Sequence, residues 1–301
     1  MADDDALFAA AEALPPELFA VIDGGKFDDV ARLLLEAGLS GRPLYLEGGD
    51  PAARAAAGHL VPLYEARDLR AAIALGREPG ALVIWSWPKG EMALYRHLRT
   101  LNLVKIPNGA RAEAEAEGED VSGMPACETV LFRHWDPNVL GVILPVLTFE
   151  QAARLMGPAT GLAFAADGEG PVLRPGLPAP PVPPPPLRFS PEQMAGMGQG
   201  LQVQSYRKIE RYLYSADPEL MATWPIDHIR RGIVEADRTG RALGLITEKS
   251  LGQWTYLEVA SNGAFGQDEA ILKAFHESPW SPADTLDAMY DVMIHVTEQG
   301  T

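Results

Sequence analysis

A seven-residue stretch, LFRHWDP (131–137), places His134 two residues before Asp136. A histidine beside a carboxylate can act as a general base, and both side chains can also bind a metal ion. Asp23 is a further candidate, because it ends an apolar run and ligands often bind at strand ends in α/β folds. One candidate function is therefore a hydrolase or metal-dependent enzyme that uses Asp23, His134 and Asp136.

Asp136 also has a structural interpretation. Asp136-Pro137, followed by NVLGVIL (138–144), is typical of a helix start, with aspartate as the N-cap and proline at the first helical position. A carboxylate that accepts backbone N–H groups is already occupied. A His–Asp pair would also need a nucleophile, and the sequence contains no Gly-x-Ser-x-Gly motif.

Asp23 and Arg133 have structural interpretations as well. Asp23-Gly24-Gly25 is ordinary turn chemistry, and Arg133 can form an ion pair with either Asp23 or Asp136. We therefore expect no catalytic residue. We expect structural roles for Asp23, Phe132, Arg133, Asp136 and Pro137.

No other motif predicts a cofactor or a metal site. Gly24-Gly25-Lys26 lacks the spacing of a phosphate-binding loop, and there is no Gly-x-Gly-x-x-Gly. Cys127 is the one cysteine of this sequence, which excludes a Cys-rich zinc site within it. The histidines outside LFRHWDP have no partner at ligand spacing. We expect no cofactor, no metal and no small-molecule substrate.

The composition limits the possible partners and the compartment. A net charge of −16 argues against nucleic acid, whose phosphates require clustered Lys and Arg. No basic amphipathic stripe predicts binding to an anionic membrane, and no stretch approaches the length of a membrane span. The acidic N-terminal sequence, with Pro15-Pro16, does not resemble a secretory signal. We expect a cytoplasmic protein.

The first half of the chain alternates short apolar runs with amphipathic segments. The helical spacing predicts helices over 27–38, 68–76 and 90–101, with a charged loop over 111–120. Predicted strands lie at 18–23, 43–48, 60–66, 81–87, 103–107 and 128–135. This alternation indicates an α/β lobe, a sheet of about five or six strands covered by helices.

The composition changes after residue 166, and a mostly α-helical lobe follows. Residues 167–187 are rich in Pro and Gly, which predicts an extended spacer; the tract PPVPPPP (180–186) is alternatively a docking ligand. Capping boxes that begin at Ser190 and Ser281 frame a lobe of about four or five helices. The predicted domains are an α/β domain (1–166), a linker (167–187) and a helical domain (188–301).

Residues 18–165 contain, in this order, the segments FAVIDGG, PLYLEGG, LVPLYEA, ALVIWSW and HLRTLNLVKI, and then Phe132-Arg133, two residues, and Asp136-Pro137. This order resembles the effector-adaptor family of bacterial type VI secretion systems, first catalogued as a domain of unknown function. The most specific element of the resemblance is the Phe-Arg, two residues, Asp-Pro motif. The segment LPVLTFEQAARLMGP (144–158), a glutamine-bearing helix that ends at Gly-Pro, strengthens it.

The resemblance implies a function without catalysis. Such adaptors are effector chaperones: they bind a toxic effector and help load it onto the valine–glycine-repeat spike protein. They are usually encoded beside that effector and stay in the cytoplasm. The implied partners are therefore the cognate secreted effector and the spike protein.

Overall fold

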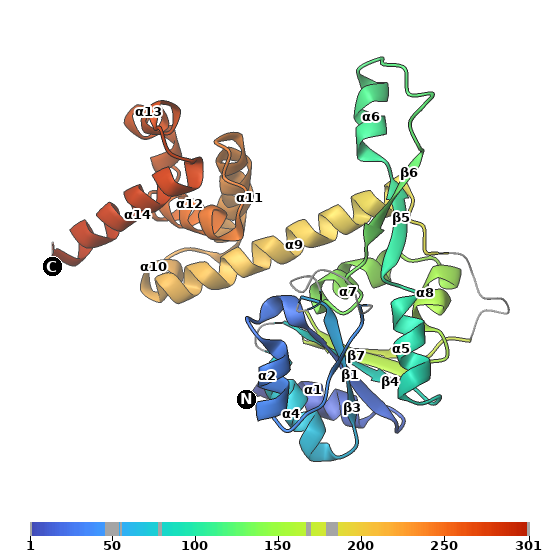
Figure 1. Ribbon diagram of the computed structural model, residues 1–301. Helices are drawn as coiled ribbons and strands as arrows, with labels where there is room; N and C mark the ends of the chain where they lie inside the picture. The colour runs from blue at the N-terminus through green and yellow to red at the C-terminus, as the bar shows by residue number, and fades with distance from the viewer. Residues whose placement is uncertain are drawn as a thin grey trace. The chain divides into compact units, whose positions relative to one another are not determined.

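A computed structural model describes residues 2–45, 54, 56–77, 80–166, 170–178 and 186–299, with the backbone alone at 2–3 and 291–299. The chain divides into two compact units, Met1–Leu201 and Gln202–Thr301 (Figure 1). None of the helices in the described ranges is both long and apolar enough to cross a lipid bilayer.

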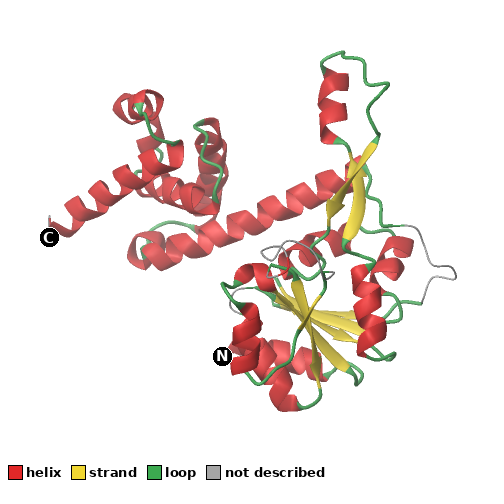
Figure 2. Cartoon of the chain, in the orientation of Figure 1, coloured by secondary structure: helices red, strands yellow, loops and turns green. Residues whose placement is uncertain are grey.

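The first unit contains a six-stranded sheet (Figure 2). Its strands, in spatial order, are β2 (Arg42–Pro43), β3 (Gly58–Leu63), β1 (Leu18–Asp23), β4 (Leu82–Ser86), β7 (Gly161–Ala165) and β8 (Pro171–Pro175). Every neighbouring pair is antiparallel. The predicted α/β lobe with a sheet of five or six strands is confirmed. The rule for ligand sites at parallel strand ends does not apply to it.

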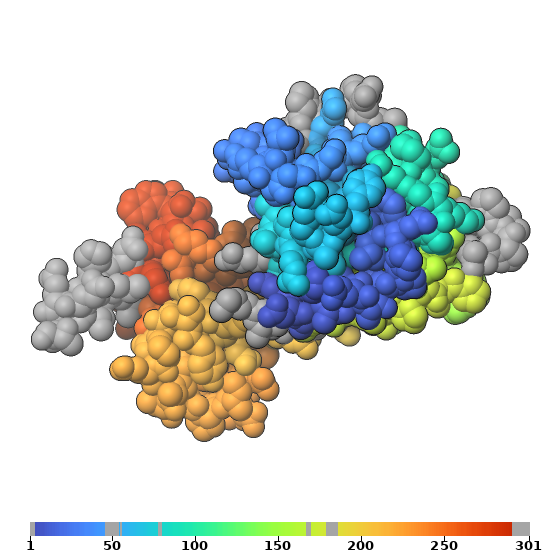
Figure 3. Space-filling model, turned by 90° about the horizontal axis from the view of Figure 1, so that it is seen from below, coloured from blue at the N-terminus to red at the C-terminus, as the bar shows by residue number. Residues whose placement is uncertain are grey.

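Helices cover both faces of this sheet, because side chains along each strand alternate between the faces. On β1, Ala20 and Ile22 face one core, while Phe19 and Val21 face the other. The first core lies under α1 (Ala2–Glu12), α2 (Val30–Glu36) and α4 (Ala66–Gly76), seen from outside in Figure 3. The second core lies under α5 (Glu91–Arg99), α7 (Pro137–Ile143) and α8 (Phe149–Met156).

Two further strands, β5 (Leu103–Pro107) and β6 (Cys127–Leu131), form a separate antiparallel ribbon. Helix α6 (Gly109–Ala116) follows β5, so the predicted loop over 111–120 is wrong in its first half. The Asn108 side chain accepts a hydrogen bond from the backbone N–H of Arg111, and this cap starts α6. The alanines and glutamates that follow favour a helix.

Strand β6 ends at Leu131, four residues before the end of the predicted strand 128–135. The chain turns there, since the N–H of Asp136 donates to the carbonyl of Arg133 at 3.0 Å. Strand 43–48 was also wrong in its extent: β2 covers Arg42–Pro43, and residues 46–48 lie outside the described ranges.

The division of the chain differs from the predicted domains 1–166, 167–187 and 188–301. Within the predicted linker, β8 pairs with β7 and belongs to the sheet. The core of the first unit also contains Leu187, Phe189 and Met197. The first unit therefore extends to residue 201. Of the tract 180–186, residues 180–185 lie outside the described ranges, so its predicted roles as spacer or ligand stay predictions.

The second unit is mostly helical, as predicted. Helix α9 (Pro191–Ala216) leads into it, and the rest comprises α10 (Pro218–Ala222), α11 (Ile226–Ala242), α12 (Glu248–Ala260), η3 (Phe265–Gln267), α13 (Glu269–Glu277) and α14 (Pro282–Gln299). Trp254, which is fully buried, lies in its core with Ile229 and Ile233. The N–H of Asp284 donates to the Ser281 hydroxyl at 3.2 Å, so the predicted cap of α14 is present.

Candidate functional site

The candidate site is centred on Asp23, which is fully buried at the end of β1. One carboxylate oxygen, Oδ1, accepts hydrogen bonds from the indole N–H of Trp135 and the backbone N–H of Gly25, both at 3.1 Å. The other, Oδ2, accepts from the guanidinium of Arg133 and forms an ion pair with it. Asp23 is thus held by three donors, two of which come from LFRHWDP.

Arg133 connects Asp23 to Asp136. Its Nη2 lies 3.5 Å from Asp136 Oδ2, and the Arg133 side chain is 41% exposed while both carboxylates are buried. Asp136 Oδ1 accepts from the backbone N–H of Asn138 at 2.9 Å, and Pro137 follows at the first helical position. Asp136 is therefore the N-cap of α7 that the sequence predicted, and Arg133 pairs with both aspartates.

Trp135 reaches Asp23 because of a glycine in the neighbouring strand. Gly58 of β3 lies opposite Asp23 in the antiparallel register. A Cβ atom at Gly58 would lie 2.8 Å from the indole carbons of Trp135, closer than real Cβ contacts come. The contact was not predicted from the sequence; the available signal was a glycine two residues before the predicted strand 60–66, since glycine often marks a close approach of another segment.

His134 is fully buried, but it does not form a dyad with Asp136. Its Nε2 lies 3.0 Å from Asn102 Oδ1, and its ring packs edge-on against Phe132 and Trp135. Burial lowers the pKa of His134 to about 3, so the ring is neutral near pH 7. The histidine of LFRHWDP therefore belongs to the core, on a different hydrogen-bond partner from either aspartate.

Two further residues flank the cluster. The Tyr45 ring lies edge-on to Trp135, with centroids 6.0 Å apart. The Nδ1 of His59 lies 3.0 Å from the carbonyl oxygen of Ala57, and burial lowers the pKa of this histidine. The negative charge of Asp23 raises the His59 pKa, so Asp23 and His59 interact electrostatically.

Phe132 anchors the motif in the core, where it is 4% exposed and packs edge-on against Phe189, with centroids 6.2 Å apart. Phe189 follows the Pro-rich tract in sequence. The motif thus contacts, through Phe132, the segment that precedes α9.

A glutamine pair fixes the same segment. Gln151 forms a capping box with Thr148 at the start of α8, and its Nε2 donates to the carbonyl of Arg188 at 2.7 Å. Gln193 Nε2 donates to Gln151 Oε1 at 2.6 Å, while Gln193 also closes the predicted capping box with Ser190. The glutamine of LPVLTFEQAARLMGP therefore joins α8 to the start of α9.

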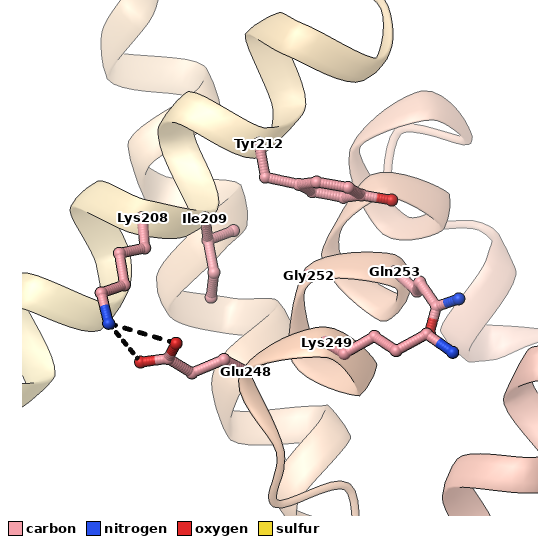
Figure 4. Close-up of a pocket in the computed structure, with 7 residues that line it drawn as sticks. All are labelled: Lys208, Ile209, Tyr212, Glu248, Lys249, Gly252 and Gln253. Atoms are coloured by element: carbon pink, nitrogen blue, oxygen red, sulfur yellow. Dashed lines mark hydrogen bonds and ion pairs between the residues drawn. The ribbon is translucent and has the colours of Figure 1, made fainter. Parts of the chain in front are cut away.

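The second unit has a cavity of about 340 Å³ between α9 and α12 (Figure 4). The cavity lies beside Tyr212, and its two lysines are ion-paired. Lys208 Nζ lies 2.9 Å from Glu248 Oε1, and Lys249 Nζ lies 2.7 Å from Asp287 Oδ2. Each lysine is neutralised by its carboxylate partner. The two lysines therefore give the cavity no net positive charge that would select an anionic ligand.

Within the described ranges, no three His, Cys, Asp or Glu side chains are grouped so that they could hold a metal ion. Comparisons with protein-family models, with curated proteins and with solved structures found no match to this chain.

Proposed function

We propose that this protein is a non-enzymatic adaptor, an effector chaperone of a type VI secretion system. It binds the cognate effector in the cytoplasm and helps load it onto the valine–glycine-repeat spike protein. The resemblance over residues 18–165 is the source of the secretion context.

One observation supports the proposal most: the signature residues form a single connected cluster of contacts. Arg133 pairs with Asp23 and Asp136, while Phe132 packs in the core. These contacts connect the end of β1 to the start of α7 and so restrict the relative movement of the two segments. A rigid surface favours protein binding, because little conformational entropy is lost when the partner docks.

The same geometry gives no support to the alternative, a hydrolase or metal enzyme using Asp23, His134 and Asp136. A carboxylate or imidazole that acts as a general base must lie within hydrogen-bond reach of the proton that it takes from the substrate. Asp23 is fully buried with three donors on its oxygens, and Asp136 caps a helix. His134 is fully buried on Asn102.

Co-expression with the genes on either side of this one, which the proposal expects to encode the effector and the spike protein, tests the proposal. We expect the tagged chain to co-purify with the effector, and the effector to reach the spike protein only when the chain is present. A second effector of the same secretion system serves as the control and should load normally without this chain. Equal delivery of the effector by cells with and without the gene for this chain would contradict the adaptor function.

Variants of Asp136 separate a structural aspartate from a catalytic one. Asp136→Asn retains an oxygen that can cap α7, so it should preserve effector loading. Loss of loading by Asp136→Asn, with an unchanged melting temperature, would instead indicate a chemical role for the carboxylate.

A further inference from the structure

An open apolar groove of about 560 Å³ lies between α13 and α14 in the second unit. Trp280, in the loop between these helices, is 63% exposed beside it. Tryptophan is among the residues most enriched at the energetic centres of protein interfaces. The apolar side chains of the groove are those of Ile271, Ala274, Trp280, Ala288 and Met289.

The loop that carries Trp280 is held by hydrogen bonds. The backbone N–H of Trp280 donates to the Ser278 hydroxyl at 3.2 Å, and the Thr285 hydroxyl donates to the same oxygen at 2.7 Å. The Ser281 hydroxyl in turn donates to Asp284 Oδ2 at 2.6 Å. The indole is therefore presented by an ordered turn, which reduces the entropy lost on binding.

The negative charge of the second unit is concentrated in the same segment. Residues 202–267 contain eight basic and eight acidic residues, whereas 268–301 contain seven acidic residues and one basic, Lys273. Glu277 lines the groove, and its ion pair with Lys273, at 3.8 Å between exposed side chains, is of the weak surface kind. A cationic partner can therefore displace Lys273 from Glu277 at little cost.

The charge distribution selects the occupant. The Met1–Leu201 unit carries sixteen basic and twenty-six acidic residues, so a second copy of this chain would bring like charge to an acidic segment. An anionic lipid surface is disfavoured for the same reason. A basic segment with an apolar face is attracted by Glu277 and by the negative net charge of residues 268–301, and it buries its apolar side chains in the groove.

We infer that the α13–α14 groove binds a basic amphipathic helix of a partner protein, with Trp280 as the apolar anchor. Amphipathic helices bind apolar grooves through a stripe of apolar side chains at positions i, i+3, i+4 and i+7. The inference rests on the proposed function for one point only: it assigns this helix to the effector.

A model peptide tests the groove without any effector. The probe is a labelled helix of Leu and Lys, about 18 residues or five turns long. Fluorescence anisotropy measures its binding to the full chain, beside a Leu/Glu peptide of the same pattern. We expect the Leu/Lys peptide to bind more tightly than the Leu/Glu peptide, with affinity that falls as salt rises. Equal binding of the two peptides would overturn the assignment of a basic partner.

Matched variants locate the binding. Trp280→Ala should weaken the Leu/Lys peptide by about ten-fold or more, a typical loss for an interface anchor. Ile246→Ala is the control, since Ile246 is 76% exposed in the same unit and does not line the groove. Glu277→Lys should also weaken binding, whereas Glu219→Lys, at an exposed glutamate of α10, should not. Equal affinities for wild type and Trp280→Ala would overturn the inference.

Two further measurements separate the remaining outcomes. Sedimentation experiments test for a dimer. A wild-type dimer that dissociates in Trp280→Ala, together with no binding of the peptide, would overturn the inference in favour of a second copy.

The second measurement is co-purification with the effector, which wild type should show and Trp280→Ala should not. If the effector co-purifies equally with both, the inference fails and the adaptor function stands. If the wild type never co-purifies with it, the adaptor function fails and the peptide result stands.

Discussion

Arg133 and Asp23, which are 110 positions apart in sequence, form an ion pair at the junction between β1 and the segment that leads into α7. Asp23 is fully buried, whereas the Arg133 side chain is 41% exposed. The pair neutralises a carboxylate that the fold has removed from water.

Arg133→Met should destabilise the protein strongly. The substitution keeps an apolar stem but leaves the Asp23 carboxylate buried with no cation. Breaking a buried pair costs about 3–5 kcal/mol, and the partial exposure of Arg133 places the loss toward the lower end. Urea denaturation measures the free energy of unfolding.

Asp23→Asn is the matched control for Arg133→Met, because the amide oxygen can still accept from Trp135 and Gly25. The double variant should be less unstable than the sum of the two single losses, since the Asp23 carboxylate that Arg133 neutralises is absent from it. Strict additivity of the two single losses would contradict an energetic role for the ion pair.

Asp136→Ala should lower the free energy of unfolding by about 0.5–2 kcal/mol, the usual cost of a lost N-cap. The side chain accepts from the backbone N–H of Asn138, a bond that alanine cannot replace. Asp136→Ser retains a capping oxygen and should lose less in the same denaturation experiment. If serine is no better than alanine, Asp136 does not act mainly as a cap.

Gly58→Ala should destabilise the first unit, because the added methyl group would lie 2.8 Å from the Trp135 ring. Moving the ring also breaks the hydrogen bond from Trp135 to Asp23, and overpacking of this kind costs about 1–3 kcal/mol. Gly198→Ala, inside α9 with nothing within 4 Å of the added Cβ, is the control. It should stabilise the helix by up to about 1 kcal/mol, as measured by thermal unfolding.

The stability of the protein should decrease as the pH falls below about 6.5, the ordinary pKa of histidine. Burial lowers the pKa of His97 to about 4 and that of His134 to about 3. In this range the unfolded chain therefore binds protons that the folded chain does not. Each such proton changes the free energy of unfolding by up to about 1.4 kcal/mol per pH unit.

Urea denaturation between pH 8 and pH 5.5 checks this dependence. His97→Gln should reduce the slope, because one of the buried imidazoles is absent. At pH 8 the imidazoles are neutral in both the folded and the unfolded state. The difference in free energy of unfolding between His97→Gln and wild type at this pH therefore measures the effect of the substitution that does not depend on pH. An unchanged slope in His97→Gln would show that His97 does not contribute.

Local signals in the sequence were sufficient for the elements whose stability depends on neighbouring residues. The apolar run 18–23 is β1, and Asp136-Pro137 starts α7. The capping box of Ser190 with Gln193 was likewise predictable, because its hydrogen bonds join residues three positions apart. The mostly helical second unit follows from apolar spacings of the same local kind.

Errors arose where a local pattern was extended too far and where contacts distant in sequence decide the structure. The strand predicted at 128–135 ends at Leu131, and the predicted linker contributes β8 to the sheet. The first shows the cost of extending a local pattern, and the second reflects pairing with β7. A Pro-rich composition indicates an extended backbone, but it does not reveal whether a neighbouring strand is present.

The sequence by itself therefore determined the layered first unit, the helical second unit and the helix caps at Asp136, Ser190 and Ser281. Only the tertiary structure decided that Arg133 bridges Asp23 and Asp136, that Gly58 makes room for Trp135, and that His134 is bound to Asn102. Periodicity and capping act over a few residues, so they can be read along the chain. Charge pairing and close packing depend on which distant segments meet, and that is set by the fold.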